Sequence, residues 1–126
     1  MIRLVPLSTG ADGQSHVEEQ SVDLATYGRD VASGWLTAGR VRFQESPPGS
    51  TLDWHCAPRR QLVVILRGTI EFETRGGERV RLNVGDVLLA ADTTGGGHRW
   101  HLVGDEPWQR LYVELAPDTD PTRPTR

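Results

Sequence analysis

The sequence contains no lysine, because all 14 of its basic residues are arginine. This excludes a lysine Schiff base and the lysine of a phosphate-binding P-loop. The single cysteine, Cys56, excludes an internal disulfide framework and a zinc cluster built on cysteines. The longest apolar run, residues 62–66, is far shorter than the about 20 residues that a transmembrane helix needs. No charged-then-apolar signal segment opens the sequence, so we expect a cytoplasmic protein with no membrane partner.

An excess of positive charge is also missing. The 17 acidic and 14 basic residues give a net charge of −3 and an isoelectric point near 5.8. A nucleic-acid partner is therefore not expected. The 126 residues, 37% of them hydrophobic, suffice for one domain with one core. Fourteen glycines and eight prolines along the chain disfavour a helical bundle and favour short strands joined by tight turns.

Short apolar and alternating segments predict an all-β protein, an antiparallel sandwich or barrel. The clearest alternation covers residues 69–74 and is followed by Gly76-Gly77, a pair suited to a two-residue hairpin. We expect residues 1–33 to form an N-terminal strand-and-loop arm, 34–116 the barrel, and 117–126 a disordered tail. The predicted strands cover residues 1–7, 34–44, 50–55, 61–66, 69–74, 79–82, 87–91, 98–103 and 108–115.

The segment from Gly49 to Gly68 resembles the first signature of the cupin superfamily. That signature has a glycine, five residues, a His-x-His pair, a glutamate a few residues on, and a glycine after six more. Here Gly49 precedes His55 by the same spacing, Gln61 stands at the glutamate position, and Gly68 ends the segment. Ala57 takes the place of the second histidine.

The segment from Gly85 to His98 resembles the second cupin signature, with Ala91 at the proline position and a loop about two residues longer. The resemblance covers residues 35–115. It implies a single cupin jelly-roll barrel, as in a small bacterial cupin with degenerate metal motifs, and commonly a homodimer. Four tryptophans in a small domain, Trp35, Trp54 and Trp108 among them, also favour a dimer.

The resemblance also implies a metal site. Matched by position, the ligands of a divalent ion such as Zn, Ni, Fe or Mn would be His55, Gln61 and His98. All three side chains are neutral, whereas a divalent ion prefers at least one anionic ligand. A fourth ligand would have to come from Asp92, His101 or water, and strand parity predicts that His101 faces outward. Weak metal binding is therefore expected.

Two further groups are candidates for contact with a small-molecule ligand. Trp100 and Phe72 are expected to line the pocket, and the forked donors of Arg59 are suited to a carboxylate or phosphate. The alternative for Arg59 and its neighbour Arg60 is a surface pair with Asp53 or Asp92. The predicted pocket wall consists of Ala57, Val63, Ile65, Phe72 and Trp100.

Three functions from different classes follow from these residues. The favoured one is a small-molecule enzyme doing non-redox acid–base chemistry, of the isomerase, cyclase, dehydratase or lyase type, with His55, His98 and Gln61 as catalytic residues. The second is a metal-dependent cupin enzyme, an oxygenase among the options, using His55, Gln61 and His98. The third is a non-catalytic small-molecule-binding cupin.

Overall fold

The computed structural model describes residues 1–124 and shows strands and turns but no helix in that range. No part of this range forms a helix that would be long and apolar enough to cross a membrane. The strands are β1 (Arg3–Thr9), β2 (Ser15–Val17), β3 (Gln20–Ser21), β4 (Ala25–Tyr27), β5 (Asp30–Ala32), β6 (Ala38–Ser46), β7 (Thr51–His55), β8 (Gln61–Arg67), β9 (Thr69–Thr74), β10 (Arg79–Leu82), β11 (Val87–Ala91), β12 (His98–Val103) and β13 (Trp108–Leu115).

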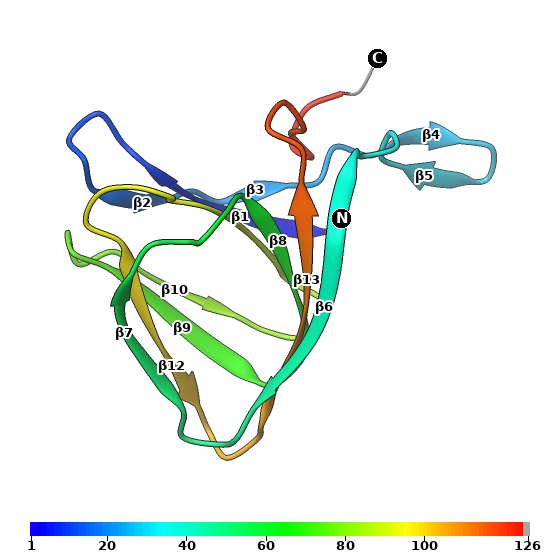
Figure 1. Ribbon diagram of the computed structural model, residues 1–126. Coiled ribbons are helices and arrows are strands. Elements are labelled where there is room, and N and C mark those ends of the chain that lie inside the picture. The colour runs from blue at the N-terminus through cyan, green and yellow to red at the C-terminus, as the bar shows by residue number, and fades with distance from the viewer. Residues whose placement is uncertain (125–126) are drawn as a thin grey trace.

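Two sheets face each other and enclose the core (Figure 1). The larger sheet has the strand order β2-β1-β11-β8-β13-β6, with β3 also paired to β1, and the smaller has the order β10-β9-β12-β7. The sheets converge at the loops that join β6 to β7 and β12 to β13. Among the described residues no hydrogen-bonded ladder joins the two sheets, so the jelly roll is an open one rather than a closed barrel.

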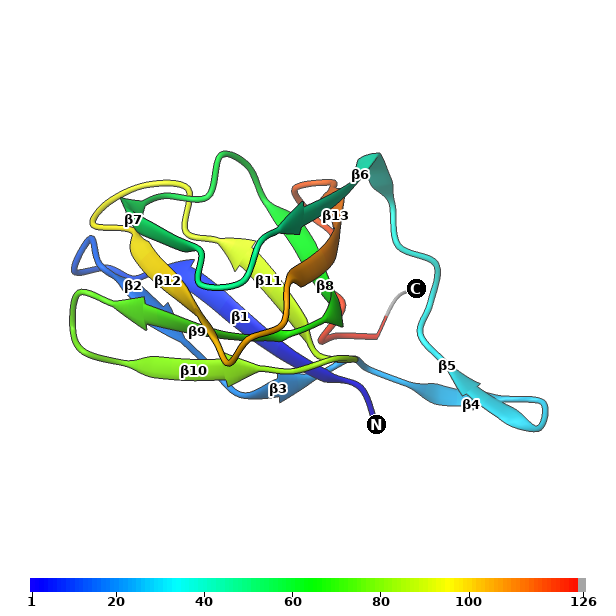
Figure 2. The same cartoon turned by 90° about the horizontal axis from the view of Figure 1, so that it is seen from below.

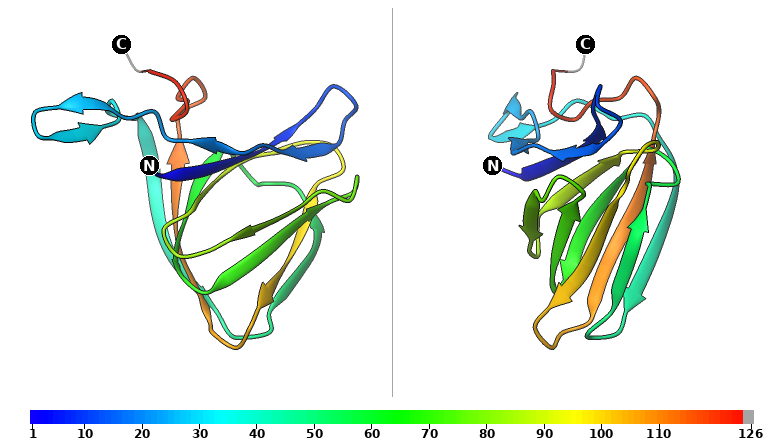
Figure 3. Two further views of the ribbon diagram at one scale, coloured as in Figure 1. Left: turned by 180° about the vertical axis from the view of Figure 1, so that it is seen from behind. Right: turned by 90° about the vertical axis from the view of Figure 1, so that its left-hand side faces the viewer.

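The first strand is an integral part of this architecture. β1 runs parallel to β11, with Leu4 opposite Val87 and Ser8 opposite Ala91, and it crosses one end of the molecule (Figure 3). Leu4 and Leu7 on it are fully buried. The strand expected over residues 1–7 is confirmed. The rest of the N-terminal arm also contains strands, because short ladders form there with β1 and between β4 and β5.

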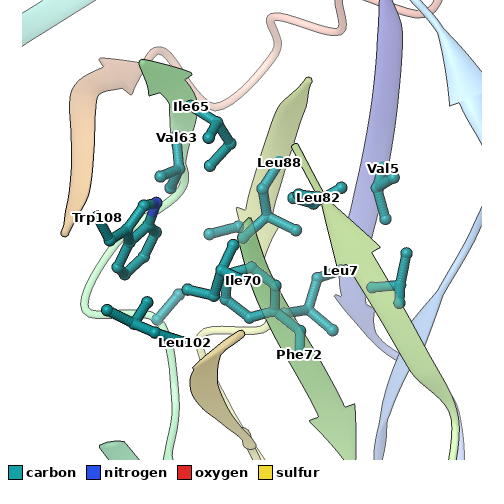
Figure 4. Packing of buried hydrophobic residues seen from close by; sticks show 13 residues of the cluster. Val5, Leu7, Val63, Ile65, Ile70, Phe72, Leu82, Leu88, Leu102 and Trp108 are labelled. Carbon is teal, nitrogen blue, oxygen red and sulfur yellow. The ribbon is translucent and has the colours of Figure 1, made fainter. Parts of the chain in front are cut away.

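The core follows from the alternation of the strands. On β9, Ile70, Phe72 and Thr74 point inward, and the intervening residues are half-buried. The main apolar cluster joins side chains from both sheets, with Ile70 and Phe72 in its middle and Trp108 at one side (Figure 4). A second, smaller cluster lies on the other face of the large sheet, around Leu4, Leu89 and Leu115.

The same alternation places polar groups inside the molecule. On β13, the side chains of Trp108, Arg110, Tyr112 and Glu114 all face the space between the sheets. β6 pairs with β13 along its whole length and contributes a further row of polar side chains. The space between the sheets is therefore apolar at depth and charged toward β6.

Two peripheral segments complete the fold. The β4–β5 hairpin projects away from the sheets (Figure 2). Residues 117–124 follow β13 in turns, and Pro121 is fully buried and accepts a backbone hydrogen bond from Asp23. The disorder of the tail over residues 117–126 stays a prediction: residues 117–124 form turns, and residues 125 and 126 lie outside the described part of the chain.

Candidate functional site

A cavity of about 660 Å³ opens between the two sheets. Its floor is apolar, and its wall includes four of the five predicted side chains: Ala57, Val63, Phe72 and Trp100. The fifth, Ile65, is buried in the core and does not line the cavity. The volume is in the range of small-molecule sites, which makes this cavity the candidate functional site.

His55 and His98 lie together in this cavity. They are direct partners across the ladder of β7 and β12, and their ring centroids are 4.4 Å apart. Phe72 packs against His98, with the ring centroids 5.9 Å apart. The two histidines that the cupin signatures single out therefore share one cavity.

An aspartate fixes the orientation of His98. Nδ1 of His98 lies 2.6 Å from Oδ2 of Asp92, and the Ser15 hydroxyl donates a hydrogen bond of 2.7 Å to the same oxygen. Asp92 and His98 are both buried. With Nδ1 held by the carboxylate, Nε2 is the ring nitrogen left for chemistry, and a buried imidazole with a carboxylate behind it takes and returns a proton readily.

His55 is held differently. Its Nδ1 lies 2.8 Å from the backbone carbonyl oxygen of Asp53, which can only accept, so Nδ1 carries the proton and Nε2 has the lone pair. Burial lowers the pKa of His55 below its usual 6.5, and the hydrogen bond to the Asp53 carbonyl oxygen offsets this only in part. The neutral form of His55 is therefore favoured at neutral pH, which makes it a proton acceptor.

The metal-ligand set expected from the cupin signatures does not fit a divalent ion. Residues 1–124 contain no group of three or more His, Cys, Asp or Glu placed to hold one. Asp92 lies on the Nδ1 side of His98, so it cannot share an ion bound to Nε2. Gln61 lines the cavity but adds a neutral amide oxygen. Two imidazoles and an amide fall short of three strong ligands with an anion among them.

The arginines at the cavity rim pair with an unexpected partner. Arg59 and Arg40 both form ion pairs with Glu114, and these two hydrogen bonds, that of Arg40 first, hold the pKa of Glu114 well below its usual 4.5. The surface pairing of Arg59 and Arg60 with Asp53 or Asp92 is therefore wrong. Asp92 is buried against His98, and Arg60 donates to the carbonyl oxygen of Ala116.

The remaining candidates fall on the sides that strand parity predicts. Trp100 and Phe72 line the cavity, and their contact with a ligand stays a prediction. His101 is exposed, with its Nε2 3.3 Å from Glu71 on the outer face, so its outward orientation is confirmed. Cys56 lies near Gly95, away from the histidine rings, and donates to its carbonyl oxygen.

Two residues of the cavity were missed by sequence analysis. Arg110 is 2% exposed, and its guanidinium lies 3.8 Å from the ring centroid of Trp108, which is 1% exposed. The sequence did indicate this arrangement, because residues 108, 110, 112 and 114 alternate along one strand and therefore share one of its faces. An arginine at an inward position next to a tryptophan is unusual enough to indicate a site.

The sequence profile of a known domain family matches this chain. The profile of the cupin domain matches residues 42–114, which is more than half of the chain. The chain belongs to the cupin family. The match spans both signature segments and the imidazole pair between the sheets. No curated protein sequence matches this cupin.

A solved structure, YhaK, supports the fold of this cupin, and two others are weakly similar to it. YhaK from Escherichia coli superimposes with a TM-score of 0.53 at 22% identity, over 84% of this chain and 48% of YhaK, so the cupin described here spans about half the length of YhaK. The SPY1581 protein from Streptococcus pyogenes gives a TM-score of 0.47 at 16% identity, over 77% of this chain and 95% of that one. A putative ethanolamine utilization protein, EutQ, from Salmonella typhimurium gives a TM-score of 0.41 at 16% identity. That match covers 98% of this chain and 99% of EutQ. These likenesses concern the fold alone.

Proposed function

We propose that this cupin is a small-molecule enzyme of the cytoplasm that catalyses non-redox proton transfer at the His55–His98 pair. The observation that carries the proposal is the unequal environment of two imidazoles whose ring centroids are 4.4 Å apart. Asp92 stands behind His98 alone, and His55 has only a backbone carbonyl. Pairs of titratable groups held in different environments are the usual basis of acid and base roles in one site.

The proposed step is proton transfer at a carbon acid next to a carbonyl group. Nε2 of His55 takes the proton from carbon, and the C–H electron pair moves to form an enol. Nε2 of His98, as the imidazolium stabilised by Asp92, gives its proton to the carbonyl oxygen. Return of a proton to the same or a neighbouring carbon completes an isomerisation, and loss of a leaving group completes a dehydration or lyase reaction. Gln61 is proposed to orient the substrate.

The test is exchange of carbon-bound hydrogen for deuterium in D₂O, followed by proton NMR on a panel of small keto acids, ketones and aldoses. We expect the wild-type protein to exchange at least one member of the panel. His98→Gln should slow exchange by about 10²- to 10⁴-fold, the usual contribution of a positioned acid or base. His101→Gln is the matched control, because His101 lies on the same strand and is exposed. It should exchange at the wild-type rate.

Two further variants and a chelator sharpen the result. Asp92→Asn keeps the shape of the partner of His98 and removes its charge, so exchange should slow without loss of fold. Treatment with EDTA should leave the rate unchanged, and a rate lost on chelation would support the metal-dependent alternative instead. Absence of exchange with every member of the panel would contradict the proposal and favour a non-catalytic binding cupin.

A further inference from the structure

The cavity holds a buried positive charge that has no carboxylate partner among residues 1–124. None of the ion pairs formed by residues 1–124 includes Arg110. Its hydrogen bonds go to neutral groups: Nε to the Tyr112 hydroxyl at 3.1 Å, and Nη1 to the Ser46 hydroxyl at 2.8 Å and the Trp108 carbonyl oxygen at 3.3 Å. Nη2 donates to no group in the described part of the chain. Buried charges are normally paired, so Arg110 indicates a missing anion.

A second unsatisfied donor lies beside it. The indole Nε1 of Trp108 is buried and has no hydrogen-bond partner among the described residues. Figure 4 shows this ring with its nitrogen on the side of Val63, whose side chain lines the cavity. The ring lies under the Arg110 guanidinium, with 3.8 Å from its centroid to the guanidinium carbon. A buried Trp N–H usually has an acceptor, so two donors in one corner of the cavity lack the same kind of partner.

We propose that Arg110 and Trp108 form the seat of a substrate carboxylate. A carboxylate offers two oxygens in one plane, which suits one guanidinium N–H and one indole N–H side by side. The cation–π contact at Trp108 orients the guanidinium and stabilises it only in part. The carboxylate supplies both the missing charge and the missing acceptors.

The position of the seat defines the rest of the ligand. Phe72 lies between the seat and the histidines, with its ring centroid 6.3 Å from that of Trp108 and 5.9 Å from that of His98. An acid whose carboxylate lies at Arg110 therefore presents a group separated from it by an apolar spacer to the imidazole pair. The substrate class is a small organic acid that reacts at a position remote from its carboxylate. The assignment of the reacting position rests on the function proposed above, whereas the carboxylate seat does not.

The positive charge of the arginines at the cavity rim also favours an anionic ligand. Arg40, Arg42 and Arg59 all line it, against the single carboxylate of Glu114. Arg42 forms none of the ion pairs seen within residues 1–124. The chain is acidic as a whole, with a net charge of −3, so this concentration of arginine is local. Such a local field raises the concentration of anions at the entrance.

The test is binding of defined acids by the full-length protein. The probes are 4-phenylbutyrate, 4-oxopentanoate and benzoate, each compared with its primary amide, and inorganic phosphate. We expect at least one acid to bind, by calorimetry, and to shift the Trp108 indole N–H signal in ¹⁵N NMR, with its amide weaker by on the order of tenfold or more. Amides that bind as well as the acids, or phosphate that binds more tightly than all of them, would overturn the carboxylate seat.

Variants locate the seat. Arg110→Gln should weaken binding of the acid by on the order of tenfold or more, and Trp108→Phe, which keeps an aromatic ring, by a smaller factor. Arg42→Gln is the matched control, since it removes the same charge from an exposed position on the same cavity. Its effect should be small at about 0.15 M salt because exposed charges are screened. If Arg42→Gln costs as much as Arg110→Gln, the cavity attracts anions generally and the seat is wrong.

Folding and function are separated within the same experiment. Circular dichroism checks that Arg110→Gln keeps the β spectrum, and if it does not, Trp108→Phe carries the test. His98→Gln should bind the acids as the wild type does. If the acids bind but neither the wild type nor any variant exchanges hydrogen, the proposed acid–base function is contradicted and the carboxylate seat is not. If hydrogen exchange is observed but no acid binds, the carboxylate seat is contradicted and the proposed function is not.

Discussion

Gly97 lies against the backbone of His55, so that a Cβ atom on Gly97 would stand 2.4 Å from the His55 carbonyl oxygen. Its φ of +74° is in the left-handed region that side chains disfavour. Gly97 therefore lets the loop after β11 approach β7 closely enough for His98 to pair with His55.

Replacement of Gly97 by alanine should destabilise the protein by about 3 kcal/mol, from the left-handed backbone and the clash together. Gly77→Ala is the control. Gly77 also has a positive φ, +88°, but a Cβ there would meet nothing within 4 Å, so only the backbone cost of about 1 kcal/mol should remain. Urea unfolding of both variants measures the difference. Equal losses would mean that the approach of Gly97 to His55 is not constrained.

The prediction of weak metal binding is tested by restoring the cupin ligands. Ala57→His with Gln61→Glu adds an imidazole and a carboxylate to a cavity that already holds His55 and His98. Zinc or nickel affinity should rise more than about 100-fold, because losing even a residue that only hydrogen-bonds to a metal ligand costs about 10- to 100-fold. Calorimetric titration compares the wild type, the double variant and Ala57→His alone, which should gain less. Tight binding by the wild type with no gain in the double variant would show that the ligand assignment is wrong.

His16 on β2 joins the two sheets through the Glu78 carboxylate and also pairs with Asp12. Hydrogen bonds to these two carboxylates, that to Asp12 first, raise the pKa of His16 above its usual 6.5. A raised histidine pKa stabilises the fold at pH values below 6.5, and that contribution is lost as the pH rises through the folded-state pKa. An NMR titration should give a pKa above 6.5, falling in Glu78→Gln and unchanged in Glu71→Gln. A pKa at or below 6.5 in the wild type would contradict the pairing.

The homodimer stays a prediction, with a revised basis. Trp108 is buried in the core and Trp54 packs under Arg75 and Arg99, so neither offers free aromatic surface. Trp35, however, is fully exposed, and Phe43 on the edge strand β6 is 74% exposed. Exposed apolar groups along an edge strand are suited to a second copy of the chain.

Light scattering should therefore give twice the chain mass of 14.0 kDa. Phe43→Glu should give the monomer mass. Val84→Glu is the control, because Val84 is similarly exposed, at 62%, but lies in the turn between β10 and β11. A mass of 14.0 kDa for the wild type across micromolar concentrations would contradict the dimer.

The sequence predicted those elements whose signal is local. The bounds of β9, β11, β12 and β13 were predicted from alternating or continuous apolar residues between turn residues, because these patterns lie within each strand. The Gly76-Gly77 hairpin was predicted with two positive φ angles, but only Gly77 has one. Hydrogen bonds between Thr74 and both Gly77 and Glu78 close a longer turn instead.

Features that depend on distant segments could not be predicted in this way. Spacing from glycines placed His55 and His98 in one cavity, but the role of Asp92 depends on a loop without periodic pattern, and Ser15 reaches it from 77 residues earlier. The strand expected over residues 34–44 is shifted along the chain, because β6 covers Ala38–Ser46 and its length is set by the ladder with β13. That ladder has a register shift between Ala38 and Val41.

The parallel pairing of β1 with β11 has a consequence for how the protein folds. Leu4 pairs with Val87, so β1 cannot pair with β11 in the large sheet until residues 87–91 have left the ribosome. Its buried leucines are exposed in the meantime, and pairings of such long sequence separation form slowly. The nascent chain therefore carries the apolar strand β1 without its β11 partner until residues 87–91 are available to pair with it.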